Sequence, residues 1–382
     1  MHHPWNRLAL AGLWLGLFAA AAHGAAKLQI PDAVTRRDGT TIRTIEVTKA
    51  TMKGVTYKPF GKPDAAAKTI PFEQVEEIRW GDARRFNLVI RHVNEEEWDR
   101  ALKALERTVK PEPRDFWYKP YRALLHGHIL LETDKPKEAL KKLDLVVDEY
   151  PNSFYALRAI HGKARAHREL DQHDEAAKTY RRLERHGGLW KLIGKEGEAE
   201  SYVRGEKLER AAEAYEGLVR SCEGVLREPG PLKNDLDSVR EIYQRALVGK
   251  AMVLIKQGRP AKARRWIDQI DEKITSKASR LRLYMALGEL HFDAGRKSSD
   301  EAEQKIHFKK AVLAYMRVYI LYPDAKELRP QAMFGAATAS TYLGSSADRG
   351  RARRLYKELI ETYPKSELVD KAKTGLKELG GT

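Results

Sequence analysis

The chain has 382 residues, enough for two domains or for one domain followed by an extended array. Hydrophobic residues make up 42% and charged residues 32%, a balance typical of a helix-rich soluble protein and not of a membrane-embedded or disordered one. The formal net charge is +16, which favours an anionic partner. Cys222 is the only cysteine, so an intramolecular disulfide is excluded, and we expect this thiol to be a small buried hydrophobe.

The first 26 residues have the composition of a secretory signal peptide. MHHPWNR carries an arginine, LALAGLWLGLFAAAA is continuously apolar, and AHGAA supplies small residues for cleavage. The apolar run is shorter than the ~20 residues that span a bilayer. We therefore expect cleavage after Gly24 or Ala26 and export to a periplasm or equivalent envelope space, with an uncleaved anchor as the alternative. Because no cysteine follows the site, attachment through a lipidated cysteine is excluded.

Residues 27–83 are predicted to form a small β module. Asp38-Gly39 and Lys53-Gly54 are turn signals beside the β-prone segments TIRTIEV, VTYKP and KTIPFEQVEEIRW. Apolar residues alternate with polar ones at three places: Ile45 and Val47, Val55 and Tyr57, and Ile70 and Phe72. Four or five short strands in this length resemble a small SH3-like or Sm-like barrel. Sm-like barrels can bind RNA, but no RNA-reading motif occurs here.

Residues 84–366 repeat one pattern. An alanine is followed by a bulky residue four positions later, an aliphatic residue three positions after that, and often a proline. The alanines are Ala101, Ala139, Ala176, Ala211, Ala263, Ala311 and Ala352. Successive alanines lie 35 to 52 residues apart, a period typical of stacked helical repeats.

The spacing has a physical reason, because positions 0, 4 and 7 lie on one face of an α-helix. The alanine lets a neighbouring helix approach, and the bulky residue fills the space beside it. We therefore predict that Tyr180, Tyr215, Tyr315 and Tyr356 are core residues and not stacking platforms. A preceding helix carries its own small residue in six of the repeats: Gly127, Ala164, Ala199, Ala251, Gly288 and Ala337. We expect turns between paired helices at three glycines: Gly258, Gly295 and Gly344.

The order of small residue, turn, alanine, bulky residue and proline resembles the tetratricopeptide repeat. The resemblance covers about residues 85–366 and is loose around 190–240. The Tyr-Pro-x-Ser endings at 150–153 and 363–366 are similar to repeats of bacterial envelope adaptor and outer-membrane assembly proteins. The resemblance implies a mainly all-α solenoid of antiparallel helix pairs, in which the first helix of each pair lines a concave groove.

Two segments interrupt the period, and one follows it. REPGPLKND at 227–235 contains a turn signal and lengthens one connection. GRKSSDEAEQKIHFK at 295–309 inserts residues between paired helices, so we expect both helices to be longer there. Residues 367–382 are amphipathic and are predicted to form the capping helix that an open array needs for solubility.

The sequence predicts no active site, cofactor or metal. The sequence lacks a glycine-rich phosphate loop, a G-x-S-x-G elbow, an H-E-x-x-H motif and paired cysteines. His126 and His128 are two residues apart on a predicted helix and so point to different faces. His161, His167 and His173 are also poorly spaced for one metal ion. An enzyme with a helical accessory array is therefore disfavoured.

One group of residues predicts a binding surface. Arg158, His161, Arg165 and Arg168 follow one another at steps of three and four, so they share one stripe of a helix. If this helix lines the groove that the resemblance implies, corresponding positions of other repeats are Tyr121, Leu124, His128, Arg245, Arg282 and Met285. Arginine makes bidentate contacts with carboxylates. The hypothesis is that this wall binds an acidic peptide or a C-terminal carboxylate; a solvated basic face is the alternative.

The predicted function is an exported, non-enzymatic scaffold that binds a protein or peptide, acidic in character, through the groove of the array. The alternative is a module for an anionic envelope polymer or a membrane surface, because residues 84–382 carry +13 of the net charge. Export argues against nucleic acid as the partner. Polyelectrolyte binding weakens steeply with salt, whereas a shape-matched peptide groove responds less, so salt dependence separates the two interpretations.

Overall fold

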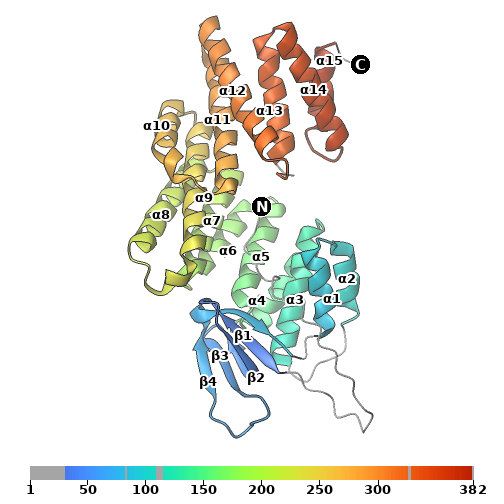
Figure 1. Cartoon of the computed structure of the whole chain (residues 1–382), viewed down its shortest axis with the longest axis vertical. Helices are drawn as coiled ribbons and strands as arrows, with labels where there is room; N and C mark the ends of the chain where they lie inside the picture. Colours follow the sequence, from blue (N-terminus) through green and yellow to red (C-terminus); the bar gives the residue numbers. More distant parts are fainter. Residues whose placement is uncertain (1–30, 82–83, 109–114, 326–327, 381–382) are drawn as a thin grey trace. The chain divides into compact units, whose positions relative to one another are not determined.

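The computed structural model describes residues 31–81, 84–108, 115–325 and 328–380 (Figure 1). The predicted signal peptide and the expected helix-ending Pro113 lie outside these residues. The described chain divides into two compact units. The N-terminal unit runs to Lys207 and includes Ser221–Val239, and the C-terminal unit comprises Leu208–Arg220 and the residues from Arg240 onward. Within the described ranges, no helix combines the length and apolar character needed to cross a membrane.

A five-stranded antiparallel sheet opens the N-terminal unit, as the alternation of residues predicted. The strands are β1 (Asp32–Arg36), β2 (Thr41–Thr51), β3 (Gly54–Pro59), β4 (Lys68–Pro71) and β5 (Val75–Arg79), in the spatial order β4-β3-β2-β1-β5. A short 3-10 helix, η2 (Phe72–Gln74), joins β4 to β5. The predicted turn glycines Gly39 and Gly54 both have positive φ, at 83° and 150°. Ile45 and Val47 of β2 are buried, and so are Val55 and Tyr57 of β3.

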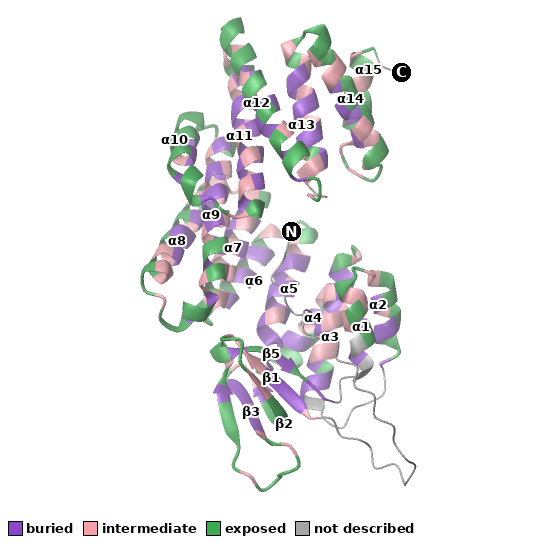
Figure 2. Cartoon of the chain, in the orientation of Figure 1, coloured by how far each residue is buried: buried purple, intermediate pink, exposed green. Residues whose placement is uncertain are grey.

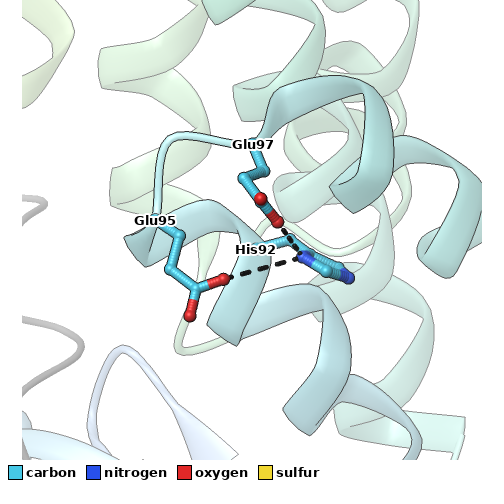
Figure 3. A group of neighbouring side chains, drawn as sticks. All are labelled: His92, Glu95 and Glu97. Carbon is cyan, nitrogen blue, oxygen red and sulfur yellow. Dashed lines mark hydrogen bonds and ion pairs between the residues drawn. The ribbon is translucent and has the colours of Figure 1, made fainter.

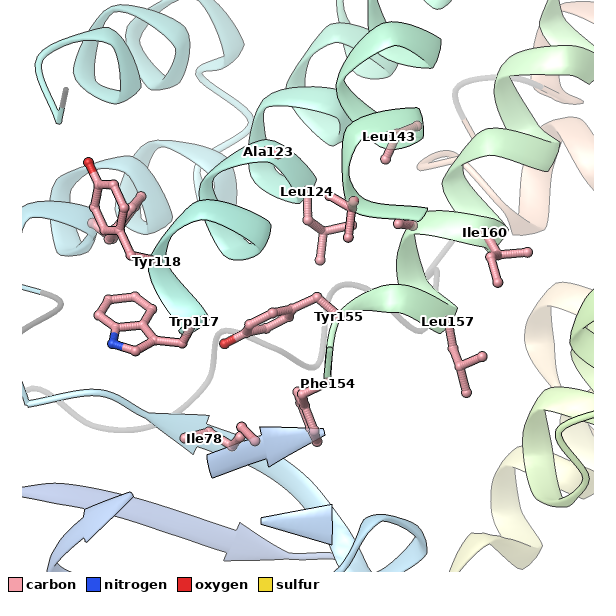
Figure 4. Close-up of a cluster of buried hydrophobic side chains, with 14 of the residues drawn as sticks. Ile78, Trp117, Tyr118, Ala123, Leu124, Leu143, Phe154, Tyr155, Leu157 and Ile160 are labelled. Atoms are coloured by element: carbon pink, nitrogen blue, oxygen red, sulfur yellow. The ribbon is translucent and has the colours of Figure 1, made fainter. Parts of the chain in front are cut away.

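One face of the sheet packs on helices and shares their hydrophobic core (Figure 4). Trp80, just after β5, stacks on Trp117 with ring centroids 4.7 Å apart and planes 8° from parallel. Its indole N–H donates a hydrogen bond to the hydroxyl of Tyr155 at 2.8 Å. The backbone N–H of Met52 donates to the carbonyl of Asn152 at 3.0 Å. The sheet is therefore fixed to the neighbouring helices by stacking, a side-chain hydrogen bond and a backbone hydrogen bond.

The helices follow in antiparallel pairs. The N-terminal unit contains α1 (Arg84–Asn94), α2 (Trp98–Glu106), α3 (Asp115–Glu132), α4 (Pro136–Glu149), α5 (Ala156–Glu169), α6 (His173–Glu184), α7 (Gly188–Arg204) and η3 (Gly230–Asp235). Parts of α8 (Leu208–Arg227) and α9 (Leu236–Lys256) belong to each unit. The C-terminal unit contains α10 (Pro260–Ile270), η4 (Asp271–Lys273), α11 (Lys277–Lys297), α12 (Glu301–Leu321), α13 (Leu328–Leu343), α14 (Ser346–Thr362) and α15 (Val369–Glu378).

The repeated alanines are fully buried positions of these helices. All seven predicted alanines have 0% exposure, and the bulky residues four positions later are buried with them, including all four tyrosines predicted to be core. Buried and exposed positions accordingly alternate along the helices (Figure 2). Cys222 is buried as expected. The fold is therefore mainly α, a tetratricopeptide-type array of helix pairs preceded by a small antiparallel sheet.

Glycines on neighbouring helices accommodate the bulky residues. Leu143 of α4 lies between Gly127 of α3 and Gly162 of α5, and a Cβ on Gly127 would stand 2.6 Å from the Leu143 side chain. Tyr315 of α12 lies in the same way between Gly288 and Gly335, where an added Cβ would come closer than 3.0 Å to its ring. Further contacts of this kind join Gly197 to Tyr180, Gly249 to Tyr215 and Gly375 to Tyr356. A large side chain between two glycines thus sets the spacing of three successive helices.

The first five helix pairs share one turn. Its central residue has positive φ and stands five positions before the buried alanine in each case: Glu96, Asp134, Asp171, Glu206 and Gly258, with φ between 56° and 67°. The next residue donates its N–H to a carbonyl five positions back, which is the 6→1 hydrogen bond of a Schellman motif. Gly258 and Gly344 are turn residues as predicted, Gly344 with φ of 76°.

The prediction for Gly295 was wrong. This glycine lies inside α11, because its missing side chain makes room for the ring of Phe308 on α12, 2.9 Å from where a Cβ would be. The helix therefore continues to Lys297 instead of turning. The expected lengthening of this pair is confirmed, since α11 and α12 each have 21 residues.

Candidate functional site

The first helices of three successive pairs lie alongside one another in the N-terminal unit. Helix α5 contacts both α3 and α7, and residues of these three helices that face one another are charged. Arg165 of α5 donates a hydrogen bond to Glu132 of α3 at 3.0 Å and lies 3.7 Å from Glu169 of its own helix. Arg168 donates to Glu200 of α7 at 2.5 Å. We call the surface formed by Glu132, Arg165, Arg168 and Glu200 the first-helix wall.

Burial makes these ion pairs more than loose surface contacts. Arg165 is 8% exposed, and the guanidinium of Arg168 also lies 5.9 Å from the centre of the Tyr180 ring. Both arginine side chains are therefore largely buried beside α5, and carboxylates of the neighbouring helices balance their charges. An incoming carboxylate competes with Glu132 and Glu169 for Arg165. The wall is charged and nearly neutral, and it is built by three helices together.

His128 lies beside this wall. Its ring meets Trp98 edge-on with centroids 5.9 Å apart, and its Nδ1 is 3.8 Å from Glu132. Burial lowers the pKa of His128 to about 4, which the nearby Arg165 charge reinforces and Glu132 opposes. At neutral pH the imidazole is uncharged, so it contributes a polar edge to the wall and no positive charge.

Arg158 and Tyr121 lie at the end of α5 and α3 that meets the sheet. Arg158 packs 5.0 Å from the centre of the Phe154 ring and donates to the carbonyl of Glu76 at 3.5 Å. Tyr121 is half-buried, 5.0 Å from the Tyr155 ring, and burial raises the pKa of its hydroxyl. Arg158 therefore connects the sheet to the helices, and Tyr121 packs against Tyr155, the residue that precedes α5.

The remaining predicted residues separate into different environments. His161 is 8% exposed and packs edge-on against Tyr180, with ring centroids 5.8 Å apart. Leu124 is a core residue. Arg245 of α9 and Arg282 of α11 are half-buried in the C-terminal unit, so they are not part of the α3–α5–α7 surface.

The C-terminal unit has a different first-helix surface. A cavity of about 220 Å³ lies there, lined by α11, α12 and α13 and by Leu368 at the start of α15. It is lined by Met285, Glu289, Phe292, Tyr315, Gln331, Phe334, Gly335, Thr338 and Leu368. Burial raises the pKa of the Glu289 carboxyl, while the Lys256 charge lowers it. The surface is apolar and aromatic around one carboxyl group.

A cluster near the first turn has the residue types of a metal site (Figure 3). Nδ1 of His92 is 2.6 Å from a carboxylate oxygen of Glu97 and 3.9 Å from one of Glu95. The other oxygen of Glu97 accepts a hydrogen bond from Arg100 at 2.5 Å. The same bridge recurs two repeats later, at the α5–α6 turn, where Nδ1 of His167 is 2.7 Å from the amide oxygen of Gln172. This recurrence with an amide in place of the carboxylate supports a structural bridge across the turn.

The sequence interpretation missed the carboxylates of the wall. Glu169 stands four residues after Arg165, a spacing at which helical side chains meet. Glu132 lies 33 residues before Arg165, and Glu200 lies 32 residues after Arg168. These separations are close to one repeat length, so shifting the sequence by one repeat could have revealed both pairs. No local signal indicated the cavity beside Glu289, since its lining comes from α11, α12, α13 and Leu368.

Comparisons with protein-family models and with curated proteins gave no match. Similar solved structures include a tetratricopeptide-repeat protein of Bacteroides fragilis, with 13% identity over 71% of this chain and 99% of that chain and a TM-score of 0.26. A repeat-containing protein of Cytophaga hutchinsonii has 14% identity over 66% of this chain and 99% of that part, with a TM-score of 0.24.

A third similar structure is the Naa15/Naa10 complex bound to HypK. It has 15% identity over 76% of this chain and a TM-score of 0.27, and the match spans 45% of the length of that chain. TM-scores of this size carry no functional argument. This chain forms an array of tetratricopeptide-type helix pairs through its own buried alanines, glycine contacts and turns.

Proposed function

We propose that this protein is a non-enzymatic scaffold that holds an extended, acidic segment of a partner protein against the first-helix wall. The observation that carries the proposal is the contact of α3, α5 and α7, which aligns Arg165 and Arg168 on one continuous surface. Surfaces built from successive repeats suit extended segments because each repeat offers an equivalent position.

The ion pairs of the wall define how such a segment binds. Each guanidinium has five N–H donors, and in both pairs a single nitrogen donates to the neighbouring carboxylate. A partner's carboxylates compete with Glu132 and Glu200 for the same two arginines. Exchange keeps both arginines paired, and the released Glu132 and Glu200 side chains, 28% and 33% exposed, turn to water.

This competition predicts whether each substitution raises or lowers partner binding. We expect Glu132→Gln/Glu200→Gln to increase recovery of the partner after crosslinking in the native envelope, because the arginines lose their internal carboxylates. Arg165→Gln/Arg168→Gln is expected to decrease it. Lys357→Gln/Lys371→Gln, two exposed positions of the C-terminal unit, is the control for net charge. Equal recovery with all three variants rejects the wall as the binding surface.

Salt separates a peptide groove from an anionic polymer. Retention that falls steeply between low and physiological salt, equally in the wall and control variants, indicates polyelectrolyte binding to the basic chain instead. Retention that depends on the wall and less on salt supports the acidic segment.

The proposal includes an envelope location and a fixed end module. The signal-like composition of residues 1–26 supports export, which mass spectrometry of the mature N-terminus tests: a chain beginning at residue 25 or 27 agrees, and an intact Met1 contradicts cleavage.

The strand order β4-β3-β2-β1-β5 with η2 before β5 supports an SH3-like assignment. Because one sheet face is packed on the helices, we propose that the module closes the end of the array.

A further inference from the structure

Helix α12 carries a row of exposed aliphatic side chains on the side opposite its buried face. Ile306, Leu313 and Ile320 are spaced by seven residues and are 52%, 61% and 61% exposed. Seven residues are two helical turns, so the three side chains lie in one line about 21 Å long. Leu321, 56% exposed, adjoins the last of them. We call these four residues the α12 stripe.

The opposite face of α12 is already used. Phe308, Ala311, Tyr315 and Val318 are buried against α11 and α13, and Tyr315 occupies the space between two glycines. The stripe therefore does not take part in the core packing of α12. Three large aliphatic side chains more than half exposed in one row are unusual on a soluble surface and indicate something that covers them.

Cations border the stripe on both sides. Lys309 lies on one side, and Lys310 and Arg317 lie on the other, with all three exposed. Arg317 extends over the Tyr284 ring of α11 at 5.4 Å. The acidic residues of α12, Glu301 and Glu303, precede Ile306. An apolar row between lysines and an arginine is complementary to a surface that has an apolar interior beneath a layer of negative charge.

We propose that the α12 stripe docks this protein on the surface of an anionic lipid bilayer. The aliphatic side chains enter the boundary between head groups and acyl chains, and the flanking cations remain at the anionic head groups. This inference is independent of the first-helix wall, which lies in the other compact unit.

Other occupants fit less well. A second copy of the chain would bring the same lysines against one another. A partner helix packs through two apolar positions per heptad, whereas three residues after Ile306, Leu313 and Ile320 the chain has Lys309, half-buried Met316 and Pro323. A single row offers no holes for the knobs of a helix, but a bilayer requires none.

The test measures the environment of the stripe itself. Leu313→Cys in the full chain is labelled with an environment-sensitive fluorophore, since Cys222 is buried and shielded from the reagent. We expect a blue shift with vesicles of phosphatidylglycerol and phosphatidylcholine at low salt, and none with phosphatidylcholine alone. The same label at Leu145→Cys, an exposed residue of α4, is the control for binding through another part of the chain.

Two further variants separate the apolar and electrostatic contributions. In the labelled chain, Ile306→Ser/Ile320→Ser is expected to weaken partition about tenfold or more. Lys309→Gln/Lys310→Gln is expected to weaken it by about tenfold, and the charge-matched Lys357→Gln/Lys371→Gln by much less. Circular dichroism melting checks that each variant is folded.

Three results overturn the inference. One is the absence of a shift with any vesicle, and another is an equal shift at positions 313 and 145. The third is a shift produced by an acidic amphipathic peptide and not by anionic vesicles, which would make the stripe a helix-docking site.

Discussion

The two units build helix pairs with the same interior and different turns. In both, a bulky residue packs against a glycine of the next helix, as Tyr180 does with Gly197 and Tyr315 with Gly335. In the N-terminal unit the turns within pairs use acidic residues with positive φ and no capping side chain, and the α9–α10 turn of the C-terminal unit has Gly258 at the same position. The last two pairs differ, because α12 and α14 begin with Asp300 and Ser345 as hydrogen-bonding N-caps. The packing contact is therefore the shared element, and local turn chemistry can vary around it.

The first-helix surfaces differ as well. The N-terminal unit balances its charges internally, through Arg165 with Glu132 and Arg168 with Glu200. The C-terminal unit offers an apolar cavity around the half-buried Glu289. One backbone architecture thus carries two chemically distinct surfaces, because residues facing the neighbouring pair are constrained and residues facing the groove are not.

Replacing a packed glycine by alanine disrupts the glycine contact that the two units share. We expect this change to have the largest effect on stability. Gly197→Ala and Gly288→Ala place a methyl group closer than 3.0 Å to Tyr180 and Tyr315. We expect each to lower the free energy of unfolding by roughly 2–3 kcal/mol, measured by urea titration.

Two kinds of variant control this result. Gly224→Ala and Gly350→Ala, in helices with nothing within 4 Å of the added Cβ, are expected to raise stability by up to about 1 kcal/mol. Adding Tyr315→Leu to Gly288→Ala should recover part of the loss, since Leu143 fills this position in another repeat. Destabilisation by all four glycine variants alike would contradict the packing role.

Acid is expected to destabilise both units through one buried histidine in each. Burial lowers the pKa of His128 and of His291 to about 4, and Arg264 beside His291 adds to the effect. An unfolded imidazole titrates near pH 6.5, so below that pH the unfolded state binds more protons and stability falls until about pH 4. We expect about 2 kcal/mol per histidine to be lost between pH 7 and 5.

The measurement compares urea midpoints at the two pH values. His128→Asn and His291→Asn should each reduce the pH dependence, whatever they do to stability at pH 7. Burial raises the pKa of Glu77 and Glu289, and these carboxyls act in the opposite direction. An unchanged pH dependence in both histidine variants argues against this assignment.

Exchanging the turn residues tests whether the turn chemistry is interchangeable. Asp171 has φ of 57° and Gly258 has φ of 67° at equivalent turns. Asp171→Gly is expected to stabilise by about 0.5–1 kcal/mol, because glycine adopts positive φ without steric cost, and Gly258→Asp to destabilise by about as much. Asp148→Gly, at an exposed position inside α4, should destabilise. Thermal melting measures the stability of all three variants. A lower melting temperature for Asp171→Gly would contradict the prediction.

The smallest effects concern the two first-helix surfaces. Glu200→Gln removes the partner of Arg168 and is expected to cost about 1 kcal/mol or less. Glu289→Gln should slightly stabilise at pH 7, since burial disfavours the charged carboxyl. Urea titration measures the change in the free energy of unfolding for both variants. A change in the same direction for both would contradict the distinction between the two surfaces.

The repeated pattern of alanine and bulky residue located the helix pairs without tertiary information. Burial on one face of a helix is encoded by spacing of three and four residues, which is why Ala139, Tyr180 and Tyr356 could be assigned to the core from sequence. Alternation in residues 41–59 identified the strands of the sheet for the same reason, with a period of two. The helical stripe of Arg158, Arg165 and Arg168 was also visible.

Only the tertiary structure decided which residues meet across helices. Gly295 has the composition of a turn, yet it packs against Phe308 within α11. Arg165 and Arg168 look like free cations in the sequence, yet carboxylates 32 and 33 residues away pair with them. Such contacts depend on the register and separation of neighbouring helices, which local periodicity does not specify because it records only which side of each helix is buried.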